Sequence, residues 1–404
     1  MPLRVLFLDL NSYFASVEQA ERPELIGKAV AVVPMMAETT SCLAASYPAK
    51  ARGVRTGTLV KDARRMCPGI IFIEADHRRY VNYHNRIIAA VEKCLPVSKV
   101  HSIDEVAIEL FGREQELDFA RNKALEIKQR IKEDVHPSLT CSIGIAPNRY
   151  LAKIASDMQK PDGLIIIRDQ DLPHCLHKLT LRDFPGIGPK TEERLFAAHC
   201  RTAKELCEKS IPEMRALWGS KFGEDFWKLI RGQVIDRPEN PRATINHSRV
   251  LSPDSRTFEH AWSNLVALLS KAAARLRDEN LFARSLHISI KLLGRNESDP
   301  YWDRHIRFFE TQDSAHLLNE LKRIWREAPK QRILQVGVTL GGLVPATKHQ
   351  LSLFEDQAQA KLMFALDKLN KKIRKNLIVF GSSVELEKAT RAPIAFGHIP
   401  KEFE

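Results

Sequence analysis

The sequence predicts a multidomain protein, with an α/β layer followed by a helical region and a compact α+β unit. Three observations predict this fold class. The chain has 404 residues, and at ~150 residues per domain this length indicates two to four domains. Strand-like and helix-like segments alternate through residues 4–168, as is typical of an α/β layer. From about residue 170 the pattern changes to short helices, and it changes again after a polar, proline-containing stretch at 233–247.

The α/β layer begins with an apolar strand-like run at residues 4–10, which contains Asp9. Asn11 or Ser12 can cap the helix that follows this strand. Apolar side chains recur at three to four residue steps from His77 to Leu95, which predicts an amphipathic helix. The other elements expected here are strands at 28–33, 99–110, 139–145 and 164–167, helices at 115–134 and 148–158, and short mixed elements at 34–76.

The second half of the chain contains a glycine-rich turn, FPGIGPK, at 184–190, which lies among the short helices. The stretch at 233–247 reads as a linker. Beyond it we expect strands at 247–251, 285–293, 304–310 and 333–340 and helices at 259–278 and 314–327. The remainder, from about residue 345, is polar and reads as a tail.

Composition narrows the class of partner and compartment. Lys and Arg number 62 and Asp and Glu 50, which gives a formal charge of +12 and favours a polyanion such as nucleic acid. The seven cysteines include no CxxC pair, which favours reduced thiols over a zinc site or disulfides. The early apolar run is too short for a signal peptide or membrane span, so we expect a soluble intracellular protein.

Three carboxylates fall at the ends of predicted strands. Asp9 closes the first strand, and Asp104 and Glu105 lie within another apolar stretch, where unpaired charges are costly. Mg²⁺ prefers such oxygen ligands. Neighbouring strand residues point to opposite faces, so Asp104 and Glu105 can share a metal only if the backbone bends, as at a hairpin tip. The alternative is that Asp104 and Glu105 form a solvated turn and Asp9 is a helix-start charge.

Three motifs together resemble the Y-family, lesion-bypass DNA polymerases of the DinB/UmuC type. They are LDLNSYFASVE at 8–18, HSIDE at 101–105, and the run from Cys141 to Gly163 that contains APNRYLAKIASDMQKPDG. The resemblance covers residues 1 to about 345. It implies a right-hand polymerase with a ferredoxin-like palm (1–25 and 77–168), small fingers (26–76), a helical thumb with a helix-hairpin-helix (169–232), a linker (233–246), an α+β little finger (247–345) and a C-terminal tail (346–404).

The resemblance also implies an activity, a cofactor and a setting. The expected reaction is template-directed, low-fidelity transfer of deoxynucleoside triphosphates to a primer 3′-hydroxyl without proofreading, in translesion synthesis, the SOS response and mutagenesis. Two Mg²⁺ ions, which Mn²⁺ can replace, would be held by the side chains of Asp9, Asp104 and Glu105 and the carbonyl of Leu10. DinB-type members carry Asp where this chain has Asn11, so this position leans toward the UmuC branch.

The resemblance assigns further residues to the nucleotide. Phe14, which follows Tyr13, would be the steric gate that excludes a 2′-hydroxyl, although a core aromatic on an amphipathic helix is the alternative. Tyr47, Lys50 and Arg52 would contact the triphosphate from the fingers, with Lys50 where the family has an Arg. For Arg52 a solvated basic loop remains the alternative. Lys160 matches the family's second phosphate-binding lysine.

The remaining candidates concern DNA and protein partners. Gly186, Gly188 and Lys190 would hold the duplex backbone, and Arg249 and Arg284, with Lys291 nearby, are candidate phosphate contacts. QLSLF at 350–354 resembles the peptide that docks bacterial polymerases on the sliding clamp, through Gln350, Leu351, Leu353 and Phe354. Packing against its own domain is the alternative. The match indicates a bacterial, cytoplasmic protein, and the resemblance leaves open an activating accessory subunit.

Two other functions stay open from the sequence. One is a non-catalytic, polymerase-like accessory protein of a mutagenesis complex, although this chain retains Asp9, Asp104 and Glu105. The other is a metal-dependent nuclease, which would not account for Phe14, Lys160 and the clamp peptide together.

Overall fold

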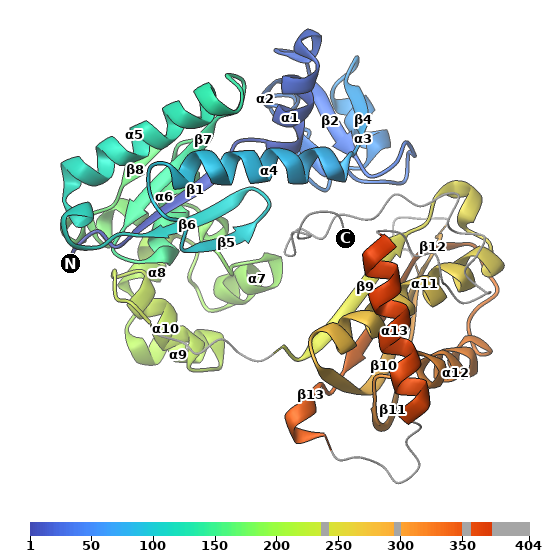
Figure 1. Ribbon diagram of the computed structural model, residues 1–404. Helices are drawn as coiled ribbons and strands as arrows, with labels where there is room; N and C mark the ends of the chain where they lie inside the picture. Colours follow the sequence, from blue (N-terminus) through green and yellow to red (C-terminus); the bar gives the residue numbers. More distant parts are fainter. Residues whose placement is uncertain (236–241, 295–299, 350–356, 374–404) are drawn as a thin grey trace. The chain divides into compact units, whose positions relative to one another are not determined.

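The structure is a computed structural model that describes residues 1–235, 242–294, 300–349 and 357–373. The chain divides into two compact units, one built mainly from residues 1–238 and the other mainly from residues 239–393. Each unit has its own large β-sheet and its own hydrophobic core (Figure 1). No helix in the described ranges is long and apolar enough to cross a membrane.

A five-stranded sheet forms the centre of the first unit, in the order β5-β6-β1-β7-β8. β1 pairs antiparallel with β6 and β7, and β8 joins β7 in parallel. The predicted α/β layer is therefore present, with its strands within a few residues of the expected positions. Its elements are β1 (Val5–Leu10), α1 (Tyr13–Glu21), α4 (His77–Glu92), β5 (Lys99–Ser102), β6 (Glu105–Glu109), α5 (Leu117–Asp134), β7 (Cys141–Ala146), α6 (Arg149–Met158) and β8 (Leu164–Ile166).

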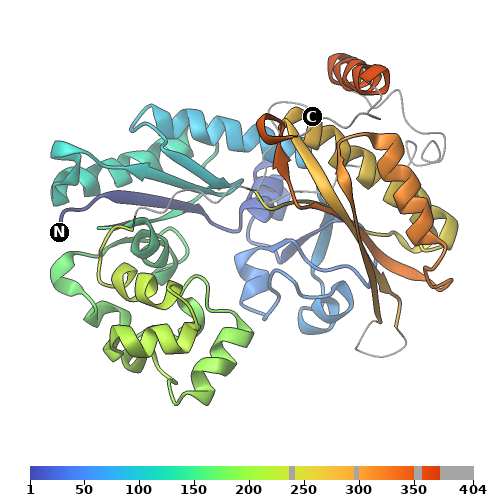
Figure 2. The same ribbon diagram turned by 90° about the horizontal axis from the view of Figure 1, so that it is seen from below.

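Different helices cover the two faces of this sheet, and the side chains of β1 alternate between them. Leu6 and Leu8 pack in one core with α4 and α5, whereas Val5 and Phe7 pack in another with α6 and the later helices. Figure 2 shows α4 and α5 on one side of the sheet and the later helical region on the other. Because alternate strand residues share a face, Asp9 projects to the α6 side.

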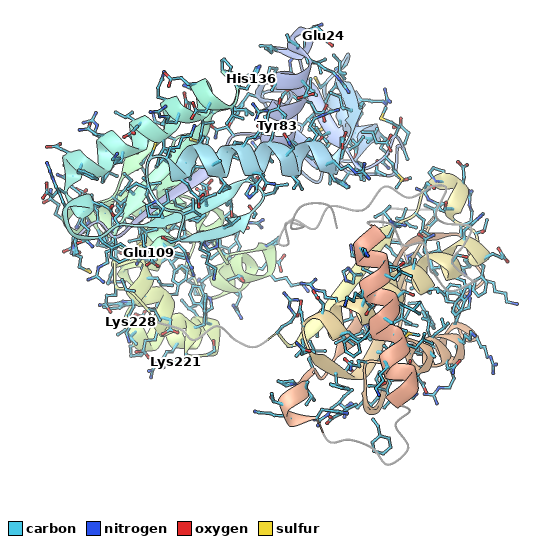
Figure 3. The ribbon with its side chains drawn as sticks, viewed as in Figure 1. Glu24, Tyr83, Glu109, His136, Lys221 and Lys228 are labelled. Carbon is cyan, nitrogen blue, oxygen red and sulfur yellow. The ribbon has the colours of Figure 1, made fainter. Side chains whose placement is uncertain are left out.

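The insertion between α1 and α4 folds as a small sheet of its own, in the order β3-β2-β4. Its core is separate from that of the large sheet. The two helices that flank the insertion, α1 and α4, are joined by a hydrogen bond. The Tyr83 hydroxyl on α4, labelled in Figure 3, donates to Glu21 at the end of α1 at 2.7 Å. The insertion contains β2 (Val30–Val33), β3 (Ala44–Ala45), α2 (Tyr47–Lys50), α3 (Val60–Met66) and β4 (Ile71–Glu74).

The helical region that follows is packed on the α6 face. Phe184 and Phe226 share a core with Leu151 of α6. Asn148 caps α6 by accepting from the Leu151 N–H at 2.8 Å, as predicted, and its amide also donates to the Leu229 carbonyl. The four helices are α7 (Pro189–Ala197), α8 (Ala203–Glu208), α9 (Ile211–Trp218) and α10 (Phe222–Leu229).

The second unit is a four-stranded antiparallel sheet in the order β11-β10-β12-β9, with two helices in its core. Three strands begin earlier than predicted: β10 at Leu281, β11 at Tyr301, and β9 at Thr244, inside the expected linker. Thr244 belongs to β9 because it pairs with Gly341 on β12. The elements are β9 (Thr244–Val250), α11 (Phe258–Asp278), β10 (Leu281–Leu292), β11 (Tyr301–Thr311), α12 (Ser314–Trp325), β12 (Ile333–Gly341) and β13 (Val344–Pro345), which pairs with β10.

Part of the predicted polar tail forms a helix, α13 (Gln357–Ile373). It is held to α11 by Arg277, which is 5% exposed and donates from Nη2 to Asp367 at 2.9 Å. Met363 is buried beside this pair. This part of the tail is therefore ordered, because its apolar side chains recur at helical spacing and one face is packed.

Candidate active site

The three predicted carboxylates come together at one end of the large sheet of the first unit. β5 and β6 form a hairpin whose tip is Ile103 and Asp104, so the backbone bends where the sequence required it. Asp9 on β1 pairs in register with Glu105 on β6. The Leu10 N–H also donates to the Asp104 carbonyl at 2.9 Å. The antiparallel pairing therefore places Asp9, Asp104 and Glu105 at neighbouring positions.

Two lysines join these carboxylates. Lys153 Nζ lies 2.5 Å from Asp9, 2.7 Å from Glu105 and 3.2 Å from Asp157. Lys160 Nζ lies 2.6 Å from Asp9 and 2.8 Å from Asp157. Lys160 was predicted as a site residue, whereas Lys153 and Asp157 were missed. Their i, i+4 spacing on α6, facing the strand that carries Asp9, is the signal that could have found them.

Burial and the neighbouring negative charges raise the pKa values of Asp104 and Glu105. Burial raises the pKa of Asp104, with a further contribution from Asp9, although the Ser102 hydroxyl bonded to Asp104 at 2.5 Å opposes the shift. Burial likewise raises the pKa of Glu105, against the lowering effect of Lys153. For Lys153 burial lowers the pKa, but the charges of Asp9, Asp157 and Glu105 outweigh it, so the net shift is upward. The burial of these carboxylates is therefore costly unless cations neutralise them, as Lys153 and Lys160 do.

This donor set fits divalent metal ions by its chemistry, since clustered carboxylates are the ligands that Mg²⁺ prefers. Within the described part of the chain, no three His, Cys, Asp or Glu side chains already converge on a common metal position. The ammonium of Lys153 lies between Asp9 and Glu105 and contacts both carboxylates. Side-chain movement of Lys153 would therefore accompany metal binding by these carboxylates.

The predicted nucleotide contacts from the insertion lie close to this cluster. Burial raises the pKa of the Tyr47 phenol. The positive charge of Lys160 opposes this shift, and the negative charge of Asp9 adds to it. Burial also lowers the pKa of Lys50, and the positive charge of Lys160 lowers it further. The Lys50 ammonium sits 4.7 Å from the centre of the Tyr47 ring. Arg52 is exposed on the turn that follows. Tyr47, Lys50 and Lys160 thus form one electrostatic group.

Phe14 and Tyr13 lie on α1, directly after the strand that carries Asp9. Phe14 is 4% exposed and stacks on Tyr80 of α4, with ring centroids 4.4 Å apart. The Tyr13 hydroxyl is buried and donates to the Tyr80 carbonyl at 2.6 Å, so it is already engaged within the protein. One side of the Phe14 ring is therefore packed against Tyr80, and the Tyr13 hydroxyl is used in a buried hydrogen bond.

The glycine-rich turn leads into α7, as the helix-hairpin-helix interpretation predicts. Gly186 has φ +93°, a conformation that favours glycine, and Gly188 is the N-cap of α7. Ile187 between them is buried, and Lys190 in the first turn is exposed. The turn therefore presents backbone and one lysine outward while Ile187 anchors it.

The arginines of the second unit are placed less favourably. Arg249 donates to Asn264 on α11 at 3.2 Å, on the face of the sheet that the helices cover. Arg284 is paired with Glu310 on β11. Both arginines therefore already have partners within the protein. The sequence could not predict this, because alternation along a strand does not by itself say which face is covered. Gln350, Leu351, Leu353 and Phe354 lie outside the described residues.

Comparison with known proteins identifies the family. The impB/mucB/samB family model matches residues 8–157, its C-terminal domain matches residues 242–353, and the HHH motif of the IMS family matches residues 169–199. DNA polymerase IV of Moorella thermoacetica is 34% identical over 388 residues, covering 93% of this chain and 94% of that protein. The chain belongs to the impB/mucB/samB family of Y-family DNA polymerases.

Other relatives agree with the DinB type of this family. DNA polymerase IV 1 of Bacillus subtilis is 29% identical, covering 97% of this chain and 96% of that protein. A Y-family polymerase chimera of Dbh and Dpo4 shares the fold at a TM-score of 0.68 and 24% identity, covering 85% of this chain and all of that one. The insertion ternary complex of Dbh polymerase has a TM-score of 0.56 at 25% identity, with the same coverage.

These matches establish the main predictions. The fold is that of a Y-family polymerase, and the chain is a DNA-directed DNA polymerase of the translesion type, with DNA and nucleotides as its partners. Y-family DNA polymerases generally depend on divalent metal. The relatives are of the DinB type, so the lean toward the UmuC branch from Asn11 was wrong. Neither a nuclease nor a non-catalytic accessory protein accounts for the matches.

Proposed function

We propose that Asp9, Asp104, Glu105 and the carbonyl of Leu10 hold two Mg²⁺ ions at the catalytic centre of this translesion polymerase. The observation that carries this proposal is the junction of Asp9 and Glu105 through Lys153, which already provides one cation among carboxylates from two strands. In the reaction the primer 3′-hydroxyl attacks the α-phosphorus of a deoxynucleoside triphosphate and pyrophosphate leaves. Bound Mg²⁺ would activate the hydroxyl and neutralise charge on the phosphates.

The protein's own contribution on the nucleotide side is positive charge and shape. Lys160, Tyr47 and Lys50 would contact the triphosphate, and Arg52 would add charge from the exposed turn. Their support is the electrostatic proximity of Tyr47 and Lys50 to Lys160. Positioning of the triphosphate against the carboxylates supplies much of the rate in such a reaction, because little else is required of the side chains.

Phe14 would act as the steric gate against ribonucleotides. Its ring is backed by Tyr80, so it cannot easily retreat from a bulky sugar. A 2′-hydroxyl would then collide with a fixed ring, and this selects by shape without a hydrogen bond. Tyr13 is a weaker candidate for nucleotide contact, because its hydroxyl donates to Tyr80.

On the DNA side, the turn at Gly186, Gly188 and Lys190 would hold a phosphate of the duplex. The backbone there is open, since a Cβ at either glycine would meet no atom within 4 Å. Successive N–H groups at such a turn suit an anion. We expect low fidelity and no proofreading, and primer degradation by the pure protein that survives Asp9→Ala would contradict this.

QLSLF at 350–354 would dock the polymerase on a bacterial sliding clamp, with Leu351, Leu353 and Phe354 in an apolar pocket. Two lost anchors at roughly 1.5–3 kcal/mol each would weaken docking by at least about a hundredfold. Leu353→Ala with Phe354→Ala should abolish clamp stimulation on long templates and leave unaided single-nucleotide insertion unchanged. Stimulation that persists would place the docking site elsewhere. Insertion by the chain alone would show that no activating subunit is required.

The catalytic assignment is tested by Asp104→Ala in a primer-extension assay with Mg²⁺. Extension should fall by at least about a thousandfold, while DNA affinity stays within a few-fold. Glu109→Ala is the matched control, because Glu109 is a carboxylate of the same β5–β6 hairpin but is exposed at the far end of β6 (Figure 3). Near-normal extension by the Asp104 variant would remove Asp104 from the site.

A further inference from the structure

The lysine turn, defined as residues 159–163, follows α6 and carries Lys160. Its shape leaves little freedom. Asp162 has φ +55°, in the left-handed region, and a Cβ at Gly163 would lie 1.8 Å from the Gln159 carbonyl oxygen. Such a turn must be held from outside, because a residue in this region is strained unless its surroundings fix it.

The holder on one side is Asn11, two residues after Asp9. Asn11 is 1% exposed. Its Oδ1 accepts from the Asp162 N–H at 2.8 Å and from the Thr140 hydroxyl at 3.1 Å, and its Nδ2 donates to Ser142 Oγ at 2.9 Å. The Asn11 N–H donates to the Thr140 carbonyl at 2.9 Å. One side chain therefore joins the end of β1, the edge of β7 and the lysine turn.

The holder on the other side is Lys128 of α5, which is 8% exposed. Its ammonium donates to three carbonyl oxygens, those of Cys141 at 2.8 Å, Asp162 at 2.7 Å and Gly163 at 3.0 Å. It also lies 2.8 Å from the Asp162 carboxylate. A buried ammonium surrounded by carbonyls fixes the backbone of the turn as a bound cation would.

We propose that Asn11 and Lys128 are positioning residues that set the place of Lys160 relative to Asp9. Asp9 and Asn11 leave the same strand end, so the hydrogen bond from Asp162 to Asn11 ties the lysine turn to the strand that carries the carboxylate. Lys160 Nζ is thereby held 2.6 Å from Asp9. This inference rests on the proposed contact of Lys160 with the triphosphate.

The chemistry predicts which substitutions at Asn11 matter. Asn11→Leu has a similar volume but leaves the Asp162 N–H buried without an acceptor, a cost that the turn can relieve only by moving. A shift of about 1 Å in such a positioning group is enough to cost orders of magnitude in rate. Asn11→Asp keeps both acceptor functions, since Ser142 Oγ can reverse and donate, so it should largely preserve the turn.

The test measures KM for the deoxynucleoside triphosphate and kcat in single-nucleotide insertion. Lys160→Ala should raise KM by about tenfold, Asn11→Leu should raise it to a similar extent, and the double variant should be no worse than Lys160→Ala alone. Asn11→Asp should stay within about threefold of the parent. Lys132→Ala is the matched control: it removes a second cation that lies 2.9 Å from Asp162, but this lysine is only half-buried and donates to the carboxylate alone.

Each outcome decides the matter. If Asn11→Leu lowers only thermal stability, or if its effect adds fully to that of Lys160→Ala, Asn11 is structural and the inference falls. If Lys160→Ala leaves KM unchanged, the nucleotide contact proposed above is wrong, and the inference falls with it. If Asn11→Leu does not fold, Ser142→Ala replaces it. That variant removes the hydroxyl that Asn11 contacts, and it should raise KM about threefold without adding to Lys160→Ala.

Discussion

The two large sheets of this polymerase differ in how their faces are covered. The sheet of the first unit has helices on both faces, whereas among the described residues the sheet of the second unit shares its core with α11 and α12 on one face. Ionic groups at the end of the first sheet are therefore partly or fully buried, and each must find a partner. The second sheet can leave small polar side chains facing water.

The face of the second sheet opposite α11 and α12 carries small polar side chains together with the charged residues Lys291, Asp303 and Arg307. A Cβ at Gly337 would lie 2.6 Å from Ser289 Oγ and one at Gly341 2.8 Å from Ser285 Oγ, so a larger residue at either position would make the facing serine side chain move. Strand register aligns other small polar residues with these positions. The face includes Asn246, Ser248, Ser285, His287, Ser289, Gly337, Thr339 and Gly341. We therefore expect function to be concentrated in a few side chains of the first sheet and distributed over many in the second.

Phe14→Ala gives the largest expected effect on a concentrated function. Removing the ring should raise the ratio of ribonucleotide to deoxyribonucleotide insertion by about a hundredfold or more, because the excluding contact is lost. Single-nucleotide insertion kinetics with both substrates measures the ratio. Phe14→Leu keeps more of the packing on Tyr80, and Phe111→Ala, at an exposed ring, is the control. An unchanged ratio would make Phe14 a core residue only.

Lys153→Met tests whether buried charge in the first sheet depends on its partner. Without the ammonium, Asp9 and Glu105 are left side by side, and the unfolding free energy of the metal-free protein should fall by about 3 kcal/mol. Denaturant unfolding with a chelator measures this, and added Mn²⁺ should stabilise the variant more than the parent. Lys93→Met, in an exposed pair with Asp134, should change stability by less than ~1 kcal/mol. If added Mn²⁺ does not offset the loss of stability, Lys153 and the metal do not neutralise the same carboxylates.

Asp104→Asn should stabilise the metal-free protein while removing its activity. The pKa of Asp104 is raised in the folded state, so the folded protein binds this proton more tightly than the unfolded chain does. The charged form therefore costs stability at neutral pH, and the cost disappears below the unfolded pKa. An increase of roughly 1–4 °C in Tm is expected at pH 7, and it should vanish near pH 3. Thermal scans beside Glu109→Gln check this, and a lower Tm at pH 7 would oppose it.

Much of this site could be predicted because its carboxylates lie in local patterns. The run around Asp9 and the hairpin tip at Asp104 are readable from neighbouring residues. Lys153 contacts Asp9 from 144 positions away, and Asn11 contacts Asp162 from 151. Such contacts depend on which face of β1 receives α6, and this is settled only when the sheet is assembled.

The same limit explains the weaker predictions in the second unit. The pattern around Arg249 is polar on both parities, so alternation alone could not say that Arg249 faces α11. Thr244 belongs to β9 through its partner Gly341, almost a hundred residues later, although its own neighbours read as linker. Strand ends and side-chain faces are thus decided by pairing.

The smallest expected effects belong to single charges on the second sheet, and two cations on its opposite faces provide the test. Lys291 on β10 shares the parity of His287 and Ser289 and lies on the uncovered face, whereas Arg249 on β9 bonds Asn264 under α11. Burial also lowers the pKa of Arg249. Both side chains carry one positive charge, so a difference between the two variants in DNA binding would show which face of the sheet contacts DNA.

Lys291→Ala should weaken DNA binding by a few-fold and reduce the slope of log affinity against log salt by about one, because one phosphate contact is lost. Arg249→Ala should leave that slope unchanged and instead lower the unfolding free energy by about 1–2 kcal/mol, because Asn264 loses its partner. Fluorescence anisotropy across a salt series, with denaturant unfolding in parallel, measures both. If Arg249→Ala reduces the slope and Lys291→Ala does not, DNA contacts the helical side of the sheet. The DNA contacts of the second unit would then have to be sought on α11 and its neighbours, because the strand face that carries Lys291 would no longer explain binding.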